Sequence, residues 1–145
     1  MEILNRKARF NYEIIDTIEC GIVLKGTEIK SIRDGKANIK DSYGIIRNNE
    51  VYILNMHISP YENGGVFNHQ ETRTRKLLLH KKEILKLRDK LEIDGYTIIP
   101  LKIYFVKNKA KILLGVAKGK KNYNKKETIK ERDIQREMEK SFKYR

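Results

Sequence analysis

The sequence has few of the residues on which several classes of protein depend. Its 145 residues include one cysteine, two prolines and no tryptophan. Because Cys20 has no second cysteine to pair with, a disulfide-built secreted scaffold is excluded. No stretch approaches the ~20 apolar residues of a membrane span, and Met1–Lys7 lacks the apolar run of a signal peptide. We therefore expect a cytoplasmic protein that is neither exported nor inserted into a membrane.

Recognisable catalytic and metal-binding motifs are also missing. His57, His69 and His80 have no carboxylate or cysteine at a metal-binding spacing. There is no Cys-x-x-Cys pair, phosphate-binding loop or Gly-x-Ser-x-Gly turn. Cys20 lies in a context that does not lower a thiol pKa, so a small buried side chain is the favoured interpretation. We predict no catalytic residue, no metal and no cofactor.

Positive charge is what the chain has in excess. It carries 32 Lys+Arg against 19 Asp+Glu, a formal net charge of +13. Such a field attracts polyanions at close to diffusion-limited rates. It favours a nucleic acid as partner over an anionic membrane surface or a merely solubilising role, but it does not distinguish RNA from DNA.

Short apolar runs rich in β-branched residues predict strands. The runs cover residues 12–18, 22–24, 51–57, 76–79, 96–106 and 110–116. Asn48-Asn49 separates the run 44–47 from 51–54, and 107–109 separates the last two runs, so two antiparallel hairpins are predicted. Pro100 cannot donate a ladder hydrogen bond, which indicates an edge position or a bulge.

Two short amphipathic helices are predicted over 27–33 and 81–93, with Gly35 and Gly95 able to end them. Many short antiparallel strands with few peripheral helices favour a mainly β fold. We expect a closed antiparallel barrel of the oligonucleotide-binding (OB) type rather than a sandwich. This domain is predicted to cover residues 1–117 and to be followed by a basic tail over 118–145.

The predicted tail differs in composition from the rest of the chain. It holds eleven lysines and arginines against five acidic residues. Its apolar residues Ile129, Ile134, Met138 and Phe142 are too sparse to dock firmly, although 128–143 has a helix-forming composition. We predict a tail that is disordered when free and helical when bound.

Two basic clusters are candidate contacts with nucleic acid. One surrounds the apolar strand near residues 76–79, where cations at both ends could contact phosphates and His80 could stack on an unpaired base. The other lies over Asn5–Arg9. The cationic candidates are Arg6, Lys7, Arg73, Arg75, Lys76, His80 and Lys81.

Other positions stay open on residue chemistry alone. Lys30 and Lys36, in a predicted helix and the turn after it, either contact RNA or are solvated. Glu19 is most simply a solvated carboxylate, although it could accept hydrogen bonds from base amino or imino groups. Leu78 is a core residue if the strand end is not an interface.

Five segments carry a resemblance to a known family. They are Gly26-Thr-Glu-Ile-Lys-Ser31, Gly35-Lys-Ala-Asn-Ile-Lys-Asp-Ser-Tyr43, Asn55-Met-His-Ile-Ser-Pro-Tyr61, Arg73-Thr-Arg-Lys-Leu-Leu-Leu-His-Lys-Lys-Glu83 and Ala117-Lys-Gly-Lys-Lys121. In this order and at this spacing they resemble the signature blocks of the SsrA-binding protein family, also called small protein B (SmpB). The resemblance runs from about Asn5 to the C-terminus.

The resemblance implies a non-enzymatic protein with an OB-type barrel that grips the tRNA-like domain of transfer-messenger RNA (tmRNA) near its elbow. It implies delivery of tmRNA to stalled ribosomes for trans-translation, in complex with elongation factor Tu and alanyl-tmRNA, and we expect a monomer. The family's RNA contacts match Asn5, Arg6, Glu19, Leu78 and His80 here.

The resemblance also assigns the tail to the empty messenger channel and decoding centre of a stalled ribosome. The implied positions are Gly119, Lys120, Lys121, Tyr123, Asn124, Lys125, Lys126, Lys130 and Arg132. The family usually carries an Asp-Lys-Arg triplet where this chain has Asn124-Lys125-Lys126, so a charge and a bidentate phosphate fork are lost. Tyr123 could instead stack on a ribosomal base.

Two rival functions are open from composition. One is a general translation factor or RNA chaperone that binds many RNAs by charge. The other is a membrane-surface or partner-helix protein that uses the tail amphipathically, although four apolar residues over sixteen form a thin face.

Overall fold

The structure is a computed structural model that describes residues 2–92 and 95–119. The predicted tail helix over 128–143 therefore lies outside the described residues. The last described strand extends to Gly119, beyond the predicted domain boundary at Ala117.

Nine strands and three α-helices follow one another along the described chain, with one 3-10 helix, η1. In chain order they are β1 (Glu2–Leu4), α1 (Ala8–Asn11), β2 (Tyr12–Ile22), α2 (Gly26–Arg33), β3 (Ala37–Asn38), β4 (Tyr43–Arg47), β5 (Glu50–Leu54), β6 (His57–Ile58), η1 (Gly65–Phe67), β7 (Arg75–Leu78), α3 (Lys81–Leu91), β8 (Tyr96–Val106) and β9 (Lys109–Gly119).

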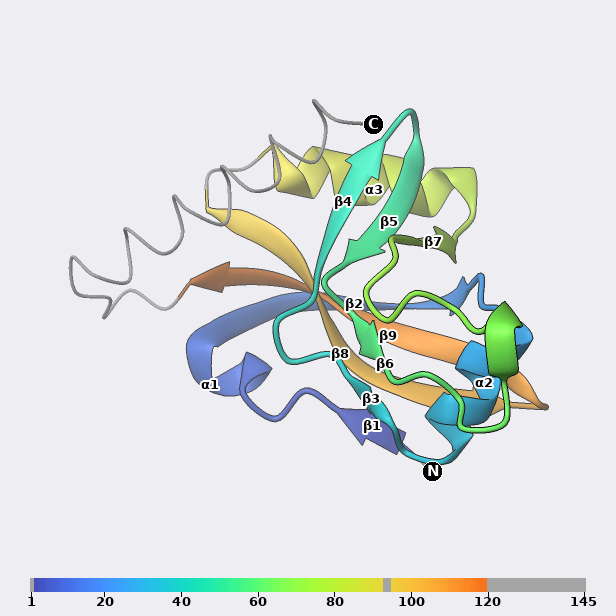
Figure 1. The fold of residues 1–145 in the computed structure, drawn as a ribbon. Helices are drawn as coiled ribbons and strands as arrows, with labels where there is room; N and C mark the ends of the chain where they lie inside the picture. Colours follow the sequence, from blue (N-terminus) through green and yellow to red (C-terminus); the bar gives the residue numbers. More distant parts are fainter. Residues whose placement is uncertain (1, 93–94, 120–145) are drawn as a thin grey trace.

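Most of the strands form one antiparallel sheet whose ends meet. Its order is β1-β8-β4-β5-β7-β2-β9, and β8 also pairs with β9. This additional pairing closes β8, β4, β5, β7, β2 and β9 into a ring, with β1 attached outside it (Figure 1). β3 and β6 form a separate two-stranded sheet. The prediction of a mainly β, antiparallel fold is confirmed.

The ring is joined unevenly. β9 pairs with β2 through residues 111–119 and with β8 through residues 109–118, whereas β4 meets β8 only at Gly44–Ile98 and β7 meets β2 only near Gly21. At the β4–β8 joint a Cβ on Gly44 would lie 2.8 Å from Ile98 Cγ2, so only glycine lets the strands approach this closely. The ring therefore consists of long pairings on both sides of β9 and two short joints, one between β4 and β8 and one between β2 and β7.

The main core fills the ring and is covered by helices. Buried strand residues such as Ile53, Leu77 and Ile112 meet Ile32 of α2 and Leu87 of α3 in one cluster. α2 and α3 lie at opposite ends of the molecule (Figure 1). On α3 the apolar residues Ile84, Leu87 and Leu91, three and four apart, face the ring, as the sequence pattern predicted, whereas on α2 Ile32 joins the core without Ile29.

A second, smaller core explains why β8 is apolar on both faces. Ile98 points into the ring, whereas Ile99 and Leu101 pack with Ala8 of α1 outside it. The register between β8 and β9 shifts between Pro100 and Lys102. Of the two alternatives for Pro100, this register shift confirms the bulge.

Both predicted hairpins are confirmed. Asn48 and Asn49 connect β4 to β5 with φ of 51° and 61°, and Lys107 and Asn108 connect β8 to β9 with φ of 49° and 65°. Two successive positive φ values give a turn whose twist matches that of the flanking strands. Sequence patterns missed β1, α1, β3, β6 and η1, which are too short to show a period.

The first turn offers a test of this backbone requirement. Left-handed backbone costs an ordinary residue about 1–2 kcal/mol and costs asparagine less. We expect Asn48→Ala to lower the free energy of unfolding by about 1 kcal/mol, and Asn48→Gly to lower it little or not at all. Urea unfolding of the two variants checks this, and equal losses in both would contradict it.

Candidate nucleic-acid interface

An open pocket lies beside the short joint between β2 and β7. Gly21 pairs with Leu78 and Ile22 with Leu77, and the Val23 amide donates to the Lys76 carbonyl at 2.9 Å. The pocket measures about 520 Å³. Its lining comprises Glu19, Cys20, Gly21, Glu50, Lys76, Leu77, Leu78, Leu79, His80, Glu83 and Lys111.

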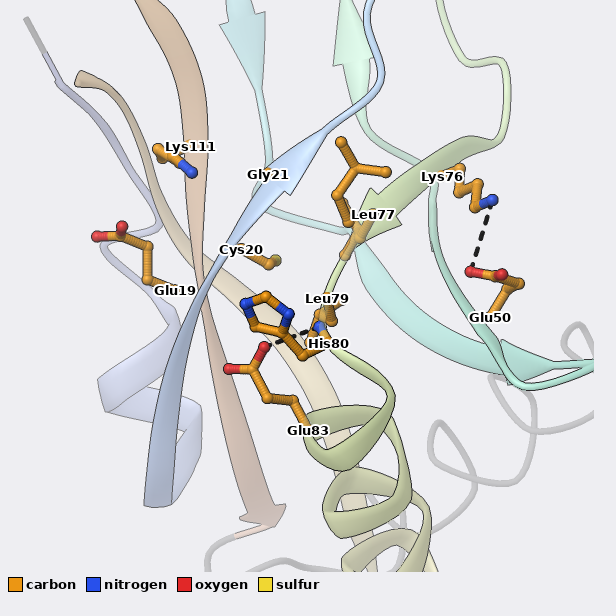
Figure 2. Close-up of a pocket in the computed structure, with 11 residues that line it drawn as sticks. Glu19, Cys20, Gly21, Glu50, Lys76, Leu77, Leu79, His80, Glu83 and Lys111 are labelled. Carbon is orange, nitrogen blue, oxygen red and sulfur yellow. Dashed lines mark hydrogen bonds and ion pairs between the residues drawn. The ribbon is translucent and has the colours of Figure 1, made fainter. Parts of the chain in front are cut away.

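Figure 2 shows Glu19 and Lys111 at one end of this pocket, Lys76 and Glu50 at the other, and His80 with Glu83 between them. The structure thus brings Glu19 together with Lys76, Leu78 and His80, which the sequence analysis singled out in a distant segment. They come from β2, β7 and the start of α3. Both acidic and basic groups are present, so the pocket offers hydrogen-bond acceptors as well as phosphate-binding cations.

Leu78 is the apolar element of the pocket. Strand alternation buries Leu77 completely, whereas Leu78 is 53% exposed. A Cβ on Gly21 would lie 3.3 Å from Leu78 Cβ, so the side chain rests closely on the β2 backbone. The interpretation of Leu78 as a core residue is therefore wrong, and its position leaves it able to contact a ligand.

His80 and Lys81 lie at the start of α3. The His80 backbone N–H donates to Glu83 Oε1 at 2.9 Å, which satisfies one amide at the helix N-terminus. The His80 side chain and Lys81 are exposed. An exposed imidazole at the mouth of the pocket can stack on a base or donate to one.

Glu19 is exposed on β2 but already has one partner. The Tyr104 hydroxyl, on β8, donates to Glu19 Oε2. Burial, together with the hydrogen bond to Glu19 and its negative charge, raises the pKa of Tyr104 above its ordinary value. Sequence reasoning missed Tyr104 and Lys111. The only available signal was their outward position in the alternation of β8 and β9, which many surface residues share.

Arg75, predicted to contact phosphate, faces the interior instead, and Arg73 shares its acidic partner while staying partly exposed. Both side chains bind Glu28, whose side chain is fully buried on α2. Arg73 Nη2 and Arg75 Nε lie 2.5 Å from Glu28 Oε1 and Oε2 respectively. The Arg75 side chain is completely buried, so the prediction that it contacts RNA is corrected. Arg73 keeps 22% exposure.

The remaining donors of Arg75 hold backbone carbonyls. Nη1 donates to Met56 at 2.6 Å and Nη2 to Glu71 at 3.1 Å. Burial alone would raise the Glu28 pKa, but the Arg73 hydrogen bonds, the Lys25 amide and Arg75 lower it below its ordinary value. The carboxylate therefore stays ionised and ties α2 to β7 and to the segment before it.

Asn5 has a structural position between β1 and α1. It is 9% exposed, and its Nδ2 donates to the carbonyls of Pro100 at 2.9 Å and Ile39 at 3.3 Å. This side chain bridges the place where the β8 ladder is interrupted. Its Oδ1 is buried without a hydrogen-bond partner. The neighbouring Arg6 and Lys7 are exposed.

Lys30 and Lys36 lie outside the pocket, on α2 and in the turn after it. Lys30 Nζ is 5.4 Å from the centre of the Tyr61 ring, and Lys36 Nζ is 3.1 Å from Glu62 Oε1. Both lysines are exposed. Of the tail positions only Gly119 is described, at the end of β9, and those from Lys120 to Arg132 lie outside the described residues.

Within residues 2–92 and 95–119 no group of three or more His, Cys, Asp or Glu side chains is arranged to hold a metal. Cys20 is buried, and burial raises the pKa of its thiol to about 12. The predicted small buried thiol is confirmed. In the same part of the chain, no helix has the length and apolar character needed to cross a bilayer.

A mainly β protein with a net charge of +13 and a mixed acidic and basic pocket at a strand joint has the features of a nucleic-acid-binding protein. The family described as "SmpB protein" matches residues 2–144 of this chain. The chain belongs to this family, whose members are also named SsrA-binding proteins.

Relatives and a solved structure agree with this placement. The SsrA-binding proteins of Staphylococcus aureus strains Newman and USA300 are each 57% identical over 141 residues, which cover 97% of this chain and 92% of the relative. A chain in the structure titled "tmRNA-SmpB: a journey to the center of the bacterial ribosome" superposes with a TM-score of 0.72 and 50% sequence identity. The match covers 86% of this chain and 87% of that one.

The buried carboxylate of Glu28 leads to a prediction. Removing one partner of a buried ion pair costs about 3–5 kcal/mol because the other charge is left uncompensated. We expect Glu28→Gln to lower the free energy of unfolding by this amount at pH 7. Glu62→Gln, which removes an exposed pair with Lys36, should cost less than about 1 kcal/mol.

The loss should depend on pH in one direction. Because the folded-state pKa of Glu28 is lowered, its contribution is complete above the unfolded value of about 4.3 and is lost as the pH falls through the folded value. The difference between wild type and Glu28→Gln should therefore shrink below about pH 4. Denaturant unfolding at pH 7 and pH 3.5 measures it, and a constant difference would contradict the assignment.

Proposed function

We propose that this chain binds the tRNA-like domain of tmRNA and delivers it to stalled ribosomes in trans-translation. It is an RNA-binding protein rather than an enzyme. The observation that carries the proposal is the 57% identity to SsrA-binding proteins across 97% of the chain. The match to the tmRNA-SmpB structure at 50% identity supports it.

The ring of strands supports a closed barrel of the OB type as the RNA-binding unit, over residues 1–117. Its interior is filled by apolar side chains, so ligands meet it from outside. OB-type barrels bind nucleic acid on an outer strand surface and adjoining loops. The pocket beside β2, β7 and α3 has such a location.

The proposed contacts are the accessible members of the predicted set. They are Arg6, Lys7, Glu19, Lys30, Lys36, Arg73, Lys76, Leu78, His80 and Lys81. The cations neutralise phosphates, whereas Glu19 accepts from base edges and Leu78 with His80 supplies apolar and stacking contact. Asn5 and Arg75 are buried and are not in this set. Asn5 donates to the Pro100 carbonyl and Arg75 donates to the Met56 carbonyl.

Further elements of the proposal rest on family membership. The tail from residue 118 enters the vacated messenger channel and the decoding centre, elongation factor Tu and alanyl-tmRNA join the complex, and the protein acts as a monomer in the cytoplasm. At the last described residue, Gly119 pairs with Tyr12, so the tail leaves from the end of the β2–β9 ladder.

Glu19 tests whether recognition is more than charge attraction. Losing an acceptor removes directed hydrogen bonds while making the surface more positive. We expect Glu19→Ala to weaken binding to the tRNA-like domain about tenfold, with bulk tRNA affinity unchanged or raised. Glu13→Ala, on the exposed face of the same strand, should leave the tRNA-like domain affinity unchanged. Tighter binding of both RNAs by Glu19→Ala would identify a mere surface charge.

The tail tests whether binding and rescue are separable. Truncation after Gly119 leaves every described strand intact, so unfolding and tmRNA affinity at physiological salt should change little. Tagging on ribosomes stalled at a message's end should be lost. Filter binding and a tagging assay measure the two activities. Normal tagging by the truncated protein would contradict the channel-occupying role.

A further inference from the structure

A row of polar side chains crosses the outer face of the ring beside the pocket. Tyr104 on β8 is paired with Lys111 of β9, and Glu19 on β2 is paired with Leu113 of the same strand. β9 therefore lies between the two residues. The Tyr104 side chain reaches across it, and its hydroxyl donates to Glu19 Oε2.

Tyr104 has a second neighbour, Lys102, against its aromatic ring. Lys102 Nζ lies 5.0 Å from the centre of the Tyr104 ring, a cation–π distance, and 3.5 Å from Glu2 Oε1. Lys102 and Tyr104 occupy alternate positions on β8, so they share one face. The aromatic ring of Tyr104 therefore contacts Lys102, and its hydroxyl contacts Glu19.

This contact changes what Glu19 can do. An exposed glutamate on a strand samples many rotamers, and ordering it on binding costs affinity. The Tyr104 bond occupies one carboxylate oxygen, and a carboxylate has a second oxygen able to accept. A carboxylate fixed in this way presents its second oxygen in one direction, which suits a directed hydrogen bond from a base amino or imino group.

We propose that Tyr104 is a positioning residue that holds the Glu19 carboxylate in the orientation in which it accepts from the RNA. The inference rests on the proposed function, because it requires Glu19 to contact tmRNA. Burial and the Glu19 carboxylate raise the pKa of Tyr104, which favours the protonated phenol that donates to Glu19.

The decisive variant is Tyr104→Phe. It keeps the ring against Lys102 and removes only the hydroxyl. Freeing a side chain that binding must then reorder should weaken affinity for the tRNA-like domain between about twofold and tenfold. The salt dependence of binding should not change, because no phosphate contact is removed. Bulk tRNA affinity should stay at the wild-type value.

A double-mutant cycle separates positioning from a general structural effect. In the Glu19→Ala background, Tyr104→Phe should cause no further loss, because there is no carboxylate left to orient. Additive losses would show that Tyr104 acts on something other than Glu19 and would overturn the inference.

A matched control is Tyr61→Phe. Tyr61 also has a lysine against its ring, Lys30, but lies on another surface. This variant should bind the tRNA-like domain as wild type does. The urea midpoints of both tyrosine variants should match that of the wild type within error, and a large loss of stability confined to Tyr104→Phe would assign the hydroxyl a role in folding instead.

Failure of the inference and failure of the proposed function give different results. If Glu19→Ala weakens the tRNA-like domain complex but Tyr104→Phe does not, only the positioning role is wrong. If Glu19→Ala itself has no effect, the contact assigned to Glu19 is wrong and the positioning role falls with it. If the wild-type protein itself does not prefer tmRNA to bulk tRNA, the proposed function is wrong as well.

Discussion

The double pairing of β8 is the constraint on which the rest of the structure depends. β8 pairs with β9 along one side and with β4 and β1 along the other, and this closes the sheet into a ring. Closure removes strand edges and encloses the apolar core. Ile99 and Leu101 point outward to α1, so β8 also anchors the N-terminal segment, and the register shift after Pro100 returns Ile103 to the main core.

The buried ion network of Glu28 decides which arginines are available at the surface. Arg73 and Arg75 look alike in the sequence. Both bind the Glu28 carboxylate, which lies forty-five and forty-seven residues earlier in the chain. Their donors hold α2 and backbone carbonyls near residues 56 and 71. The surface near β7 is then less basic than the sequence indicates, and in the proposed function recognition there depends on Glu19, Leu78 and His80.

Recognition by such a pocket differs from simple charge attraction. The net charge of +13 brings RNA to the surface, but it acts on every RNA equally. In the proposed function, the Glu19 carboxylate and the exposed Leu78 at the strand joint discriminate between RNAs by geometry. Tyr104 binds Glu19, so under our proposal the residues that carry selectivity extend beyond those that touch the RNA.

The sequence by itself determined the β class, both hairpins, α2, α3 and the charge, because these follow from local periodicity and turn chemistry, and it limited Pro100 to an edge position or a bulge. The family resemblance implied Glu19 and Leu78 as RNA contacts. Only the tertiary structure decided that Arg75 and Asn5 are buried and that Tyr104 meets Glu19. The physical reason is that their partners lie 47, 95 and 85 residues away, and no local pattern encodes which distant carboxylate or carbonyl satisfies a donor.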